Sequence, residues 1–195
     1  EWEKVTIRYI SNDPARVAAL LSGAVDVINE VPPTDIPTLA KDARVNLVKA
    51  ASIRLVYIVL NQRDDAPGIA DLDGKPLTKN PYQDARVRQA ISLMLDREGI
   101  VDKVLFDQGV ATNNQVPDGI VGHNPNLKPK YDVAAAKKLL ADAGYPNGFS
   151  MTISGSNDRF LLDGDLTQAV GQLLARGGMK VSKVEALPYS VFSKA

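Results

Sequence analysis

A run of six residues, Leu55-Val-Tyr-Ile-Val-Leu60, consists almost entirely of apolar side chains. A strand that is buried on both faces of a sheet has this composition, whereas a strand with one face in water alternates apolar and polar residues. We therefore predict that residues 55–60 form a central strand.

Strand and helix patterns alternate along most of the chain. Alternating or β-branched runs predict further strands at residues 5–10, 25–28, 45–49, 151–153 and 181–186. Apolar residues spaced three and four apart predict helices that begin near residues 13, 32, 84, 132, 161 and 187. Polar segments at 62–83 and 107–130 predict long loops. This alternation indicates an α/β fold.

Local signals mark several helix ends. Asp13 and Asp132 each stand where a side chain can accept a hydrogen bond from a free N–H of the first helical turn. Gly144 follows the last apolar position of the helix that Asp132 begins, where a left-handed residue is wanted. Gly99 lowers helix stability by about 0.5–1 kcal/mol relative to alanine, so we expect a break or a kink near it.

Composition excludes several classes of protein. The chain has 195 residues, which is enough for one domain with a full core, and its net charge is zero because 23 basic residues match 23 acidic ones. Nucleic-acid binding has no support, since it draws on an excess of Lys and Arg. Without cysteine the chain cannot form a disulfide or a thiolate metal site. No apolar run reaches the roughly 18 residues that a membrane-spanning helix needs.

Signals of catalysis are weak. His123 is the only histidine and stands in a polar loop, and no Gly-x-Ser-x-Gly elbow or phosphate-binding glycine loop is present. Asp71-Leu-Asp-Gly74 and Asp163-Gly-Asp165 lack the spacing of a calcium loop, so we interpret them as turns. We expect no cofactor, no metal and no enzymatic activity. A small hydrolase or transferase that uses Asp and Ser residues, and a protein-interaction module, are the alternatives.

Arg159 is the first candidate for a ligand contact. It stands in the polar loop Ser154-Gly-Ser-Asn-Asp-Arg-Phe160 between a predicted strand and a predicted helix, and Asn157 is a second candidate there. Ligands of α/β folds bind at the carboxyl ends of strands. A guanidinium group suits a carboxylate, such as a peptide C-terminus. Pairing of Arg159 with Asp158 or Asp163 is an equal alternative.

Two further candidates come from the predicted central strand. Asn61 follows its end, where a polar side chain can meet a ligand, and Tyr57 is either a core residue or a contact. Arg86, Arg88 and Arg97 share their helix with acidic residues, so we interpret them as a solvated face with local ion pairs.

Five segments in order resemble the extracellular solute-binding proteins of ABC importers, in the dipeptide, oligopeptide and nickel group. The chain from about residue 5 to residue 192 is similar to that family. The segments are Arg16-Val-Ala-Ala-Leu-Leu-Ser-Gly-Ala-Val-Asp-Val-Ile28 with Val31-Pro-Pro after it, Leu55-Val-Tyr-Ile-Val-Leu-Asn61, Asp84 to Val101, Asn124-Pro-Asn-Leu-Lys-Pro129, and Tyr131 to Phe149.

The resemblance implies a type II periplasmic-binding lobe with a mixed sheet flanked by helices, spanning residues 1–195 as a single lobe. It also implies a small peptide or peptide-like solute, an ABC permease as partner, and a periplasmic or membrane-tethered extracytoplasmic location. The first lobe of such a protein, its signal peptide and its returning C-terminal segment are not in this sequence. We therefore expect the chain to fold but to bind solute weakly. Gly99 departs from the family, which more often has alanine there.

Overall fold

The computed structural model describes residues 2–50, 52–65 and 67–194. The chain divides into two compact units, Glu1–Ala50 and Ala51–Ala195.

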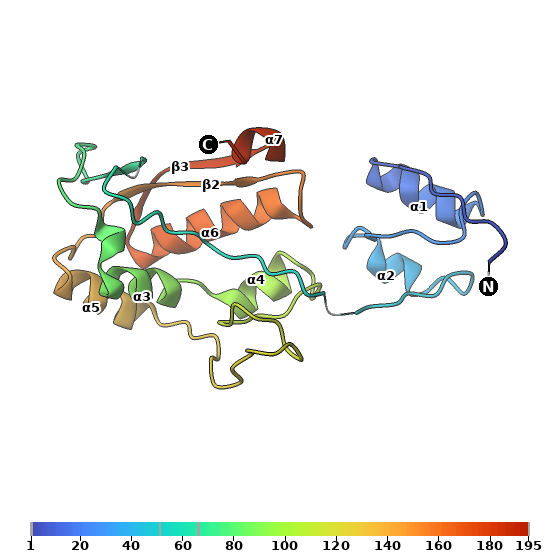
Figure 1. Ribbon diagram of the computed structural model, residues 1–195, viewed down its shortest axis with the longest axis horizontal. Coiled ribbons are helices and arrows are strands. Elements are labelled where there is room, and N and C mark those ends of the chain that lie inside the picture. Colours follow the sequence, from blue (N-terminus) through green and yellow to red (C-terminus); the bar gives the residue numbers. More distant parts are fainter. Residues whose placement is uncertain (1, 51, 66, 195) are drawn as a thin grey trace. The chain divides into compact units, whose positions relative to one another are not determined.

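The first unit contains helices α1 (Asp13–Leu21) and α2 (Ile36–Leu39) joined by irregular segments (Figure 1). The cap of α1 is Asn12, one residue before the predicted Asp13, because the Asn12 side chain accepts a hydrogen bond from the N–H of Ala15 at 2.9 Å. The Arg16 guanidinium donates to the backbone oxygens of Ile10 at 3.0 Å and Glu30 at 2.7 Å. One helical side chain thus ties the segments before and after α1 to it.

The second unit contains a three-stranded mixed sheet in the order β1 (Ile69–Ala70), β2 (Ser150–Ser156), β3 (Lys180–Leu187). β1 runs antiparallel to β2, whereas β2 and β3 are parallel, with Met151 opposite Val181. The long helix α6 (Asp163–Gly177) joins these parallel strands and lies along the sheet (Figure 1). The predicted strands at 151–153 and 181–186 and the helix between them are confirmed, as is the α/β class.

The described part of the second unit contains five more helical segments, of which α3 and α5 pack against each other. They are η1 (Pro81–Gln83), α3 (Ala85–Leu93), α4 (Arg97–Lys103), α5 (Val133–Asp142) and α7 (Tyr189–Phe192). Asp132 caps α5 by accepting from the N–H of Ala135 at 2.9 Å, and Gly144 has the predicted positive φ, +94°. No helix within the described ranges is long and apolar enough to cross a membrane.

The predicted break near Gly99 lies just before that residue. α3 ends at Leu93, and Asp96 begins α4 by accepting a hydrogen bond from the N–H of Gly99 at 2.9 Å. A Cβ at position 99 would contact the Asp96 carboxylate. Glycine therefore permits this cap, and the interruption results from the cap and not from the low helix propensity of glycine.

Phe149 lies at the centre of the core of the second unit and is 1 % exposed. The rings of Tyr82 from η1 and Tyr145 after α5 meet it edge on, with centroids 5.8 Å and 5.3 Å away. Such pairs contribute about 0.5–1.5 kcal/mol each beyond the burial of their area. Burial also raises the pKa of Tyr82 to about 12, because the phenolate would lose its hydration.

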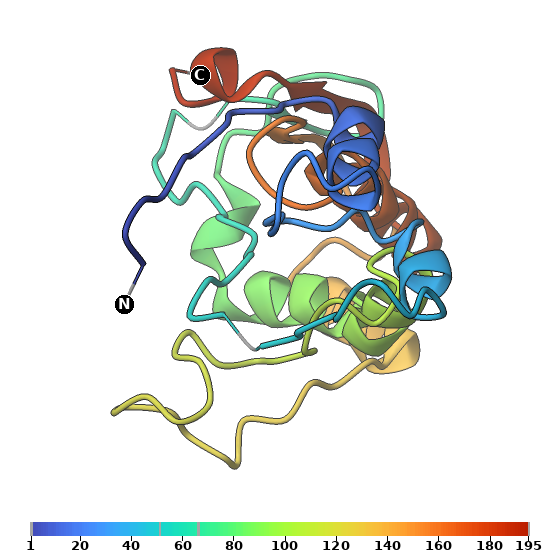
Figure 2. The same cartoon turned by 90° about the vertical axis from the view of Figure 1, so that its right-hand side faces the viewer.

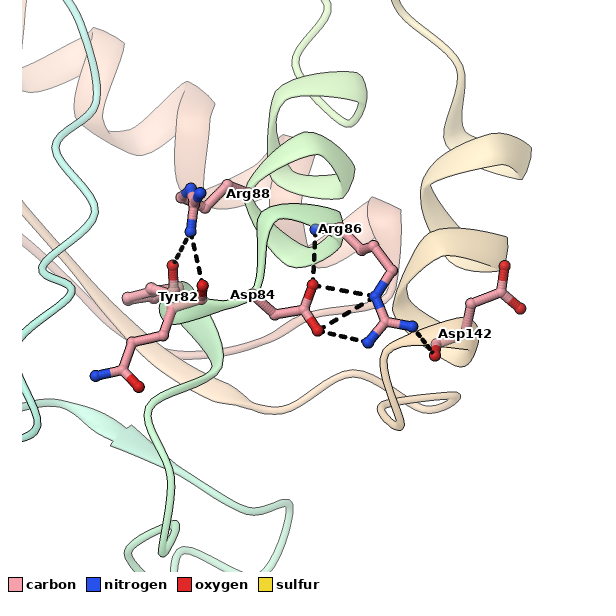
Figure 3. A network of polar contacts seen from close by, with 6 residues as sticks. Tyr82, Asp84, Arg86, Arg88 and Asp142 are labelled. Atoms are coloured by element: carbon pink, nitrogen blue, oxygen red, sulfur yellow. Dashed lines mark hydrogen bonds and ion pairs between the residues drawn. The ribbon is translucent and has the colours of Figure 1, made fainter.

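The arginines of α3 stabilise the helical layer. Asp84 accepts hydrogen bonds from the N–H and the guanidinium of Arg86, which lower the pKa of Asp84 to about 2, and a further N–H of that guanidinium donates to the backbone oxygen of Asp142 (Figure 3). Arg88 donates to the carbonyls of Tyr82 and Gln83 (Figure 3). The predicted ion pair is confirmed for Arg86, whereas Arg88, and Arg97 in α4, bind backbone carbonyls.

Four predicted strands are wrong. Residues 5–10, 25–28, 45–49 and 55–60 lie outside the strands of the described chain, and Tyr57 is 72 % exposed. A strand requires a neighbour to hydrogen-bond with, and composition reports only a preference for extended backbone. These apolar segments have the composition of strands but are not paired within the described residues.

We predict that Gly148→Ala destabilises the chain more than Gly144→Ala does. Both glycines have positive φ, +72° and +94°, so both variants bear the cost of a left-handed alanine, about 1–2 kcal/mol. A Cβ at position 148 would also contact the backbone oxygen of Gly178, whereas nothing lies within 4 Å at position 144. Urea unfolding followed by circular dichroism should show an additional loss of about 1–3 kcal/mol for Gly148→Ala. Equal losses would contradict this account.

Candidate functional site

The carboxyl ends of β2 and β3 lie side by side, because the two strands are parallel and Ser156 is opposite Leu187. The loop of residues 157–162 leaves β2 there, α6 begins after it, and α7 follows β3 (Figure 1, Figure 2). The Asp158 side chain accepts a hydrogen bond from the N–H of Tyr189 at 2.7 Å and so joins the loop to α7. This end of the sheet is where ligands of α/β folds bind.

A buried carboxylate organises this end. Asp163 is 6 % exposed, and its side chain accepts hydrogen bonds from Ser156 Oγ at 2.6 Å and from the N–H groups of Arg159 at 3.0 Å and Phe160 at 3.1 Å. The N–H of Gly164 donates to it as well, at 3.0 Å. One side chain thus forms hydrogen bonds with the last residue of β2, the loop and the first turn of α6.

These bonds decide the charge state of Asp163. Burial alone raises the pKa of a carboxyl group, but the hydrogen bonds from Ser156, Arg159, Phe160 and Gly164 stabilise the ionised form more, so the pKa of Asp163 is lowered. Asp163 is therefore a carboxylate at neutral pH with its acceptor positions occupied. It serves the loop and is not free to bind a solute.

Arg159 is exposed and is held by aromatic rings. Its guanidinium carbon lies 5.8 Å from the ring centroid of Phe160 and 5.0 Å from that of Tyr189. Arg54 stands over Phe160 from the segment before residue 60, at 5.4 Å. We call Arg54, Asn157, Arg159, Phe160 and Tyr189 the carboxyl-end cluster.

Pairing of Arg159 with an aspartate, the alternative interpretation, is wrong within the described residues. Asp163 accepts the backbone N–H of Arg159 and Asp158 accepts that of Tyr189. The Arg159 guanidinium therefore keeps its donors for solvent or for a ligand. Since guanidinium binds carboxylates in a fork geometry, the cluster can hold a carboxylate group.

Asn157 extends the pairing of the strands. Its N–H donates to the backbone oxygen of Leu187 at 2.9 Å, and its side-chain amide donates to that of Ala186 at 2.9 Å. Its amide nitrogen is therefore engaged with β3. Its amide oxygen and the second N–H of that nitrogen remain for a solute.

The structure does not bring Asn61 and Tyr57 to the cluster through any contact among the described residues. Asn61 accepts a hydrogen bond from the N–H of Arg63 at 3.1 Å, and its carbonyl accepts from the buried side chain of Asn80 at 2.8 Å. Tyr57 is exposed, so its interpretation as a core residue is wrong. As ligand contacts, both remain predictions.

The other candidate groups have structural partners. His123 shares a hydrogen bond of 2.9 Å between Nδ1 and the carbonyl of Val116, which links two parts of the loop before α5. Asp71 accepts from the N–H groups of Asp73 and Lys75, which confirms a turn there. The turn predicted at Asp163-Gly-Asp165 is wrong, because these residues form the first turn of α6. In the described part of the chain, no three His, Asp or Glu side chains are grouped to hold a metal ion.

The sequence did not identify four residues that lie at the carboxyl ends of β2 and β3, namely Arg54, Phe160, Tyr189 and Asp163. Arg54 is separated from the loop by about a hundred residues, so no local pattern connects them. Asp163 had a usable signal, because acidic residues are enriched in the first turn of a helix and a helix is predicted after this polar loop.

Comparison with known proteins gives a family match over almost the whole chain. Residues 1–194 match the model for bacterial extracellular solute-binding proteins, family 5 Middle. Heme-binding protein A of Haemophilus influenzae is 28 % identical over 148 residues, which cover 75 % of this chain and 24 % of that protein. The glutathione-binding protein GsiB of Salmonella typhi is 28 % identical over 178 residues, covering 91 % and 32 %.

Solved structures agree on the fold. The ABC transporter-associated periplasmic binding protein DppA from Helicobacter pylori, in complex with the peptide STSA, has a TM-score of 0.68 and 25 % identity. That match covers 95 % of this chain and 33 % of that one. The chain thus spans about a third or less of the length of these relatives, and its type II periplasmic-binding fold is confirmed.

We predict that Asp163→Asn loosens the loop and destabilises the second unit. An amide has one acceptor oxygen and places an NH₂ group against donors, so the loss should be about 1–3 kcal/mol near pH 7. The folded-state pKa of Asp163 is lowered, so its stabilisation is present above the unfolded value of about 3.9 and is lost as the pH falls through the folded value. The difference between variant and parent should therefore shrink in acid.

The effect of Asp163→Asn can be measured by urea unfolding between pH 7 and pH 2. Hydrogen exchange of the Arg159 and Phe160 amides reports on the loop. Asp165→Asn is the matched control, because Asp165 is an exposed carboxylate of the same helical turn. Unchanged amide protection in Asp163→Asn, or the same loss in both variants, would overturn the assigned role.

Proposed function

Because this chain belongs to family 5 of the bacterial extracellular solute-binding proteins, we propose that it is one lobe of a longer, two-lobed protein that binds a small peptide or peptide-like solute. That protein would release the solute to an ABC permease and would work in the periplasm or tethered outside the membrane. The family match and the length of the relatives, about three times that of this chain, support the proposal.

The observation that carries the proposal is the Arg159 guanidinium at the carboxyl end of the sheet. It is exposed, lies near two aromatic rings, and has no carboxylate partner among the described residues. The relatives and neighbours are named for heme, glutathione and the peptide STSA. These solutes differ in shape, but each carries a carboxylate. We therefore propose that Arg159 binds a carboxylate of the solute.

Among the described residues, no carboxyl group with a resolved pKa shift is suited to act as a general acid at neutral pH. The carboxyl groups with resolved shifts, Asp42, Asp84, Asp163 and Glu185, all have lowered pKa values. A general acid at neutral pH requires a raised one. His123 is engaged with a backbone carbonyl. The alternative of a hydrolase or transferase therefore gains no observation in its favour.

We predict that Arg159→Gln in the full-length protein weakens binding of the dipeptide Ala-Gln about ten- to a hundredfold, because a charge-assisted hydrogen bond to a carboxylate is removed. Binding of the dipeptide amide, which lacks the carboxylate, should change little. Calorimetry measures both. Arg176→Gln is the control, since Arg176 is an exposed arginine in the last turn of α6. An equal effect of Arg159→Gln on both peptides would refute the carboxylate contact.

We also predict that the 195-residue chain alone binds such solutes at least a hundredfold more weakly than the full-length protein does. A cleft between two lobes contributes contacts from both, and one lobe lacks half of them. Calorimetry of the two forms side by side tests this. Micromolar or tighter binding by the chain alone would contradict the single-lobe proposal.

Identification of the solute comes first in practice. Small molecules released by denaturing the natively purified full-length protein can be identified by mass spectrometry. A peptide or another carboxylate-bearing solute would support the transport function, and thermal-shift screening would follow an empty result.

A further inference from the structure

Two arginines share one aromatic ring at the candidate site. The guanidinium carbon of Arg54 lies 5.4 Å from the centroid of Phe160, and that of Arg159 lies 5.8 Å from it. The two groups can be no further apart than the sum of these distances, about 11 Å. Two like charges are thus held close together by a ring that attracts cations.

Neither guanidinium group is neutralised by the protein in the described ranges. Both side chains are exposed, and their contacts are with rings. The carboxylates at this end have other partners, because Asp163 is saturated by four donors and Asp158 accepts from the N–H of Tyr189. Glu185 is paired with Lys183 at 2.6 Å.

Three other exposed arginines of the chain are paired with an acid two residues away. Arg44 binds Asp42 at 2.6 Å, Arg63 binds Asp65 at 3.0 Å and Arg86 binds Asp84 at 2.6 Å. Arg54 and Arg159 differ from these because their guanidinium groups lie over a ring and have no acidic partner among the described residues. Stacking leaves the edge of a guanidinium, which carries its donors, open to a planar anion.

From this arrangement we infer that the site takes solutes with two carboxylates, one bound by Arg159 and the other by Arg54. The inference rests on the proposed function, because it assigns the solute class of the same site. One extended residue spans about 3.5 Å, so the two carboxylates of a di- or tripeptide with an acidic side chain fall within the limit set by the ring. A second carboxylate also relieves the repulsion between the guanidinium groups, which a neutral side chain cannot do.

The test compares the dipeptides Ala-Glu and Ala-Gln by calorimetry on the full-length protein at neutral pH. The two differ only in the side-chain carboxylate, which is ionised there. We expect Ala-Glu to bind at least tenfold more tightly. Arg54→Gln should reduce this preference, measured as the ratio of the two dissociation constants, to about twofold or less. Arg159→Gln should weaken binding of both peptides.

Arg63→Gln is the matched control, because Arg63 is an exposed arginine of the same segment whose partner is Asp65. It should keep the full preference for Ala-Glu. Equal binding of the two dipeptides by the parent protein, or a preference that survives Arg54→Gln, would overturn the inference and leave the proposed function intact. Binding of neither dipeptide would overturn both.

Discussion

The buried carboxylate of Asp163 is the interaction on which the candidate site depends. It joins the last residue of β2, two backbone N–H groups of the loop and the first turn of α6. The position before it, Leu162, has a left-handed backbone, φ +52°, which is unfavourable for a leucine and is tolerated when surrounding bonds fix it. Below that carboxylate, Thr167 packs so closely that Gly155 has no room for a side chain. The loop that presents Arg159 is therefore determined by a charge buried behind it.

Part of this architecture could be predicted from the sequence because it is local. Asp132, Gly144 and the parallel strands around α6 depend on contacts within a few residues or on a strand, helix, strand order with one favoured solution. The segment 55–60 could not be predicted in the same way. Its composition is that of a central strand, but a strand is defined by its partner, and the described chain supplies none to it. Its apolar side chains indicate a preference for extended, buried backbone, but pairing depends on a neighbouring strand that local sequence does not identify.

The candidate site likewise has a part that the sequence could predict and a part that it could not. Arg159 could be found because a polar loop after a strand is where α/β folds bind ligands, and the structure places it at that end. Its surroundings could not be found, because Arg54 and Tyr189 reach Arg159 and Phe160 only through the folded chain. For Asp158 and Asp163, sequence proximity suggested salt bridges to Arg159, yet both bind backbone N–H groups. Backbone donors at a helix start and a strand end compete effectively for a nearby carboxylate, and this competition leaves the guanidinium free.

An arginine that lies against aromatic rings avoids two costs of binding an anion. A guanidinium paired with a carboxylate is well positioned but must give up its partner before it can bind a ligand, whereas an unpaired one in water is mobile and loses side-chain entropy on binding. Rings limit the motion of the arginine and leave its donors unused. Phe160 does this for Arg54 and Arg159 at once, and Tyr189 is a second ring near Arg159. The cost is the repulsion of two neighbouring cations, which the proposed dicarboxylate solute would reduce.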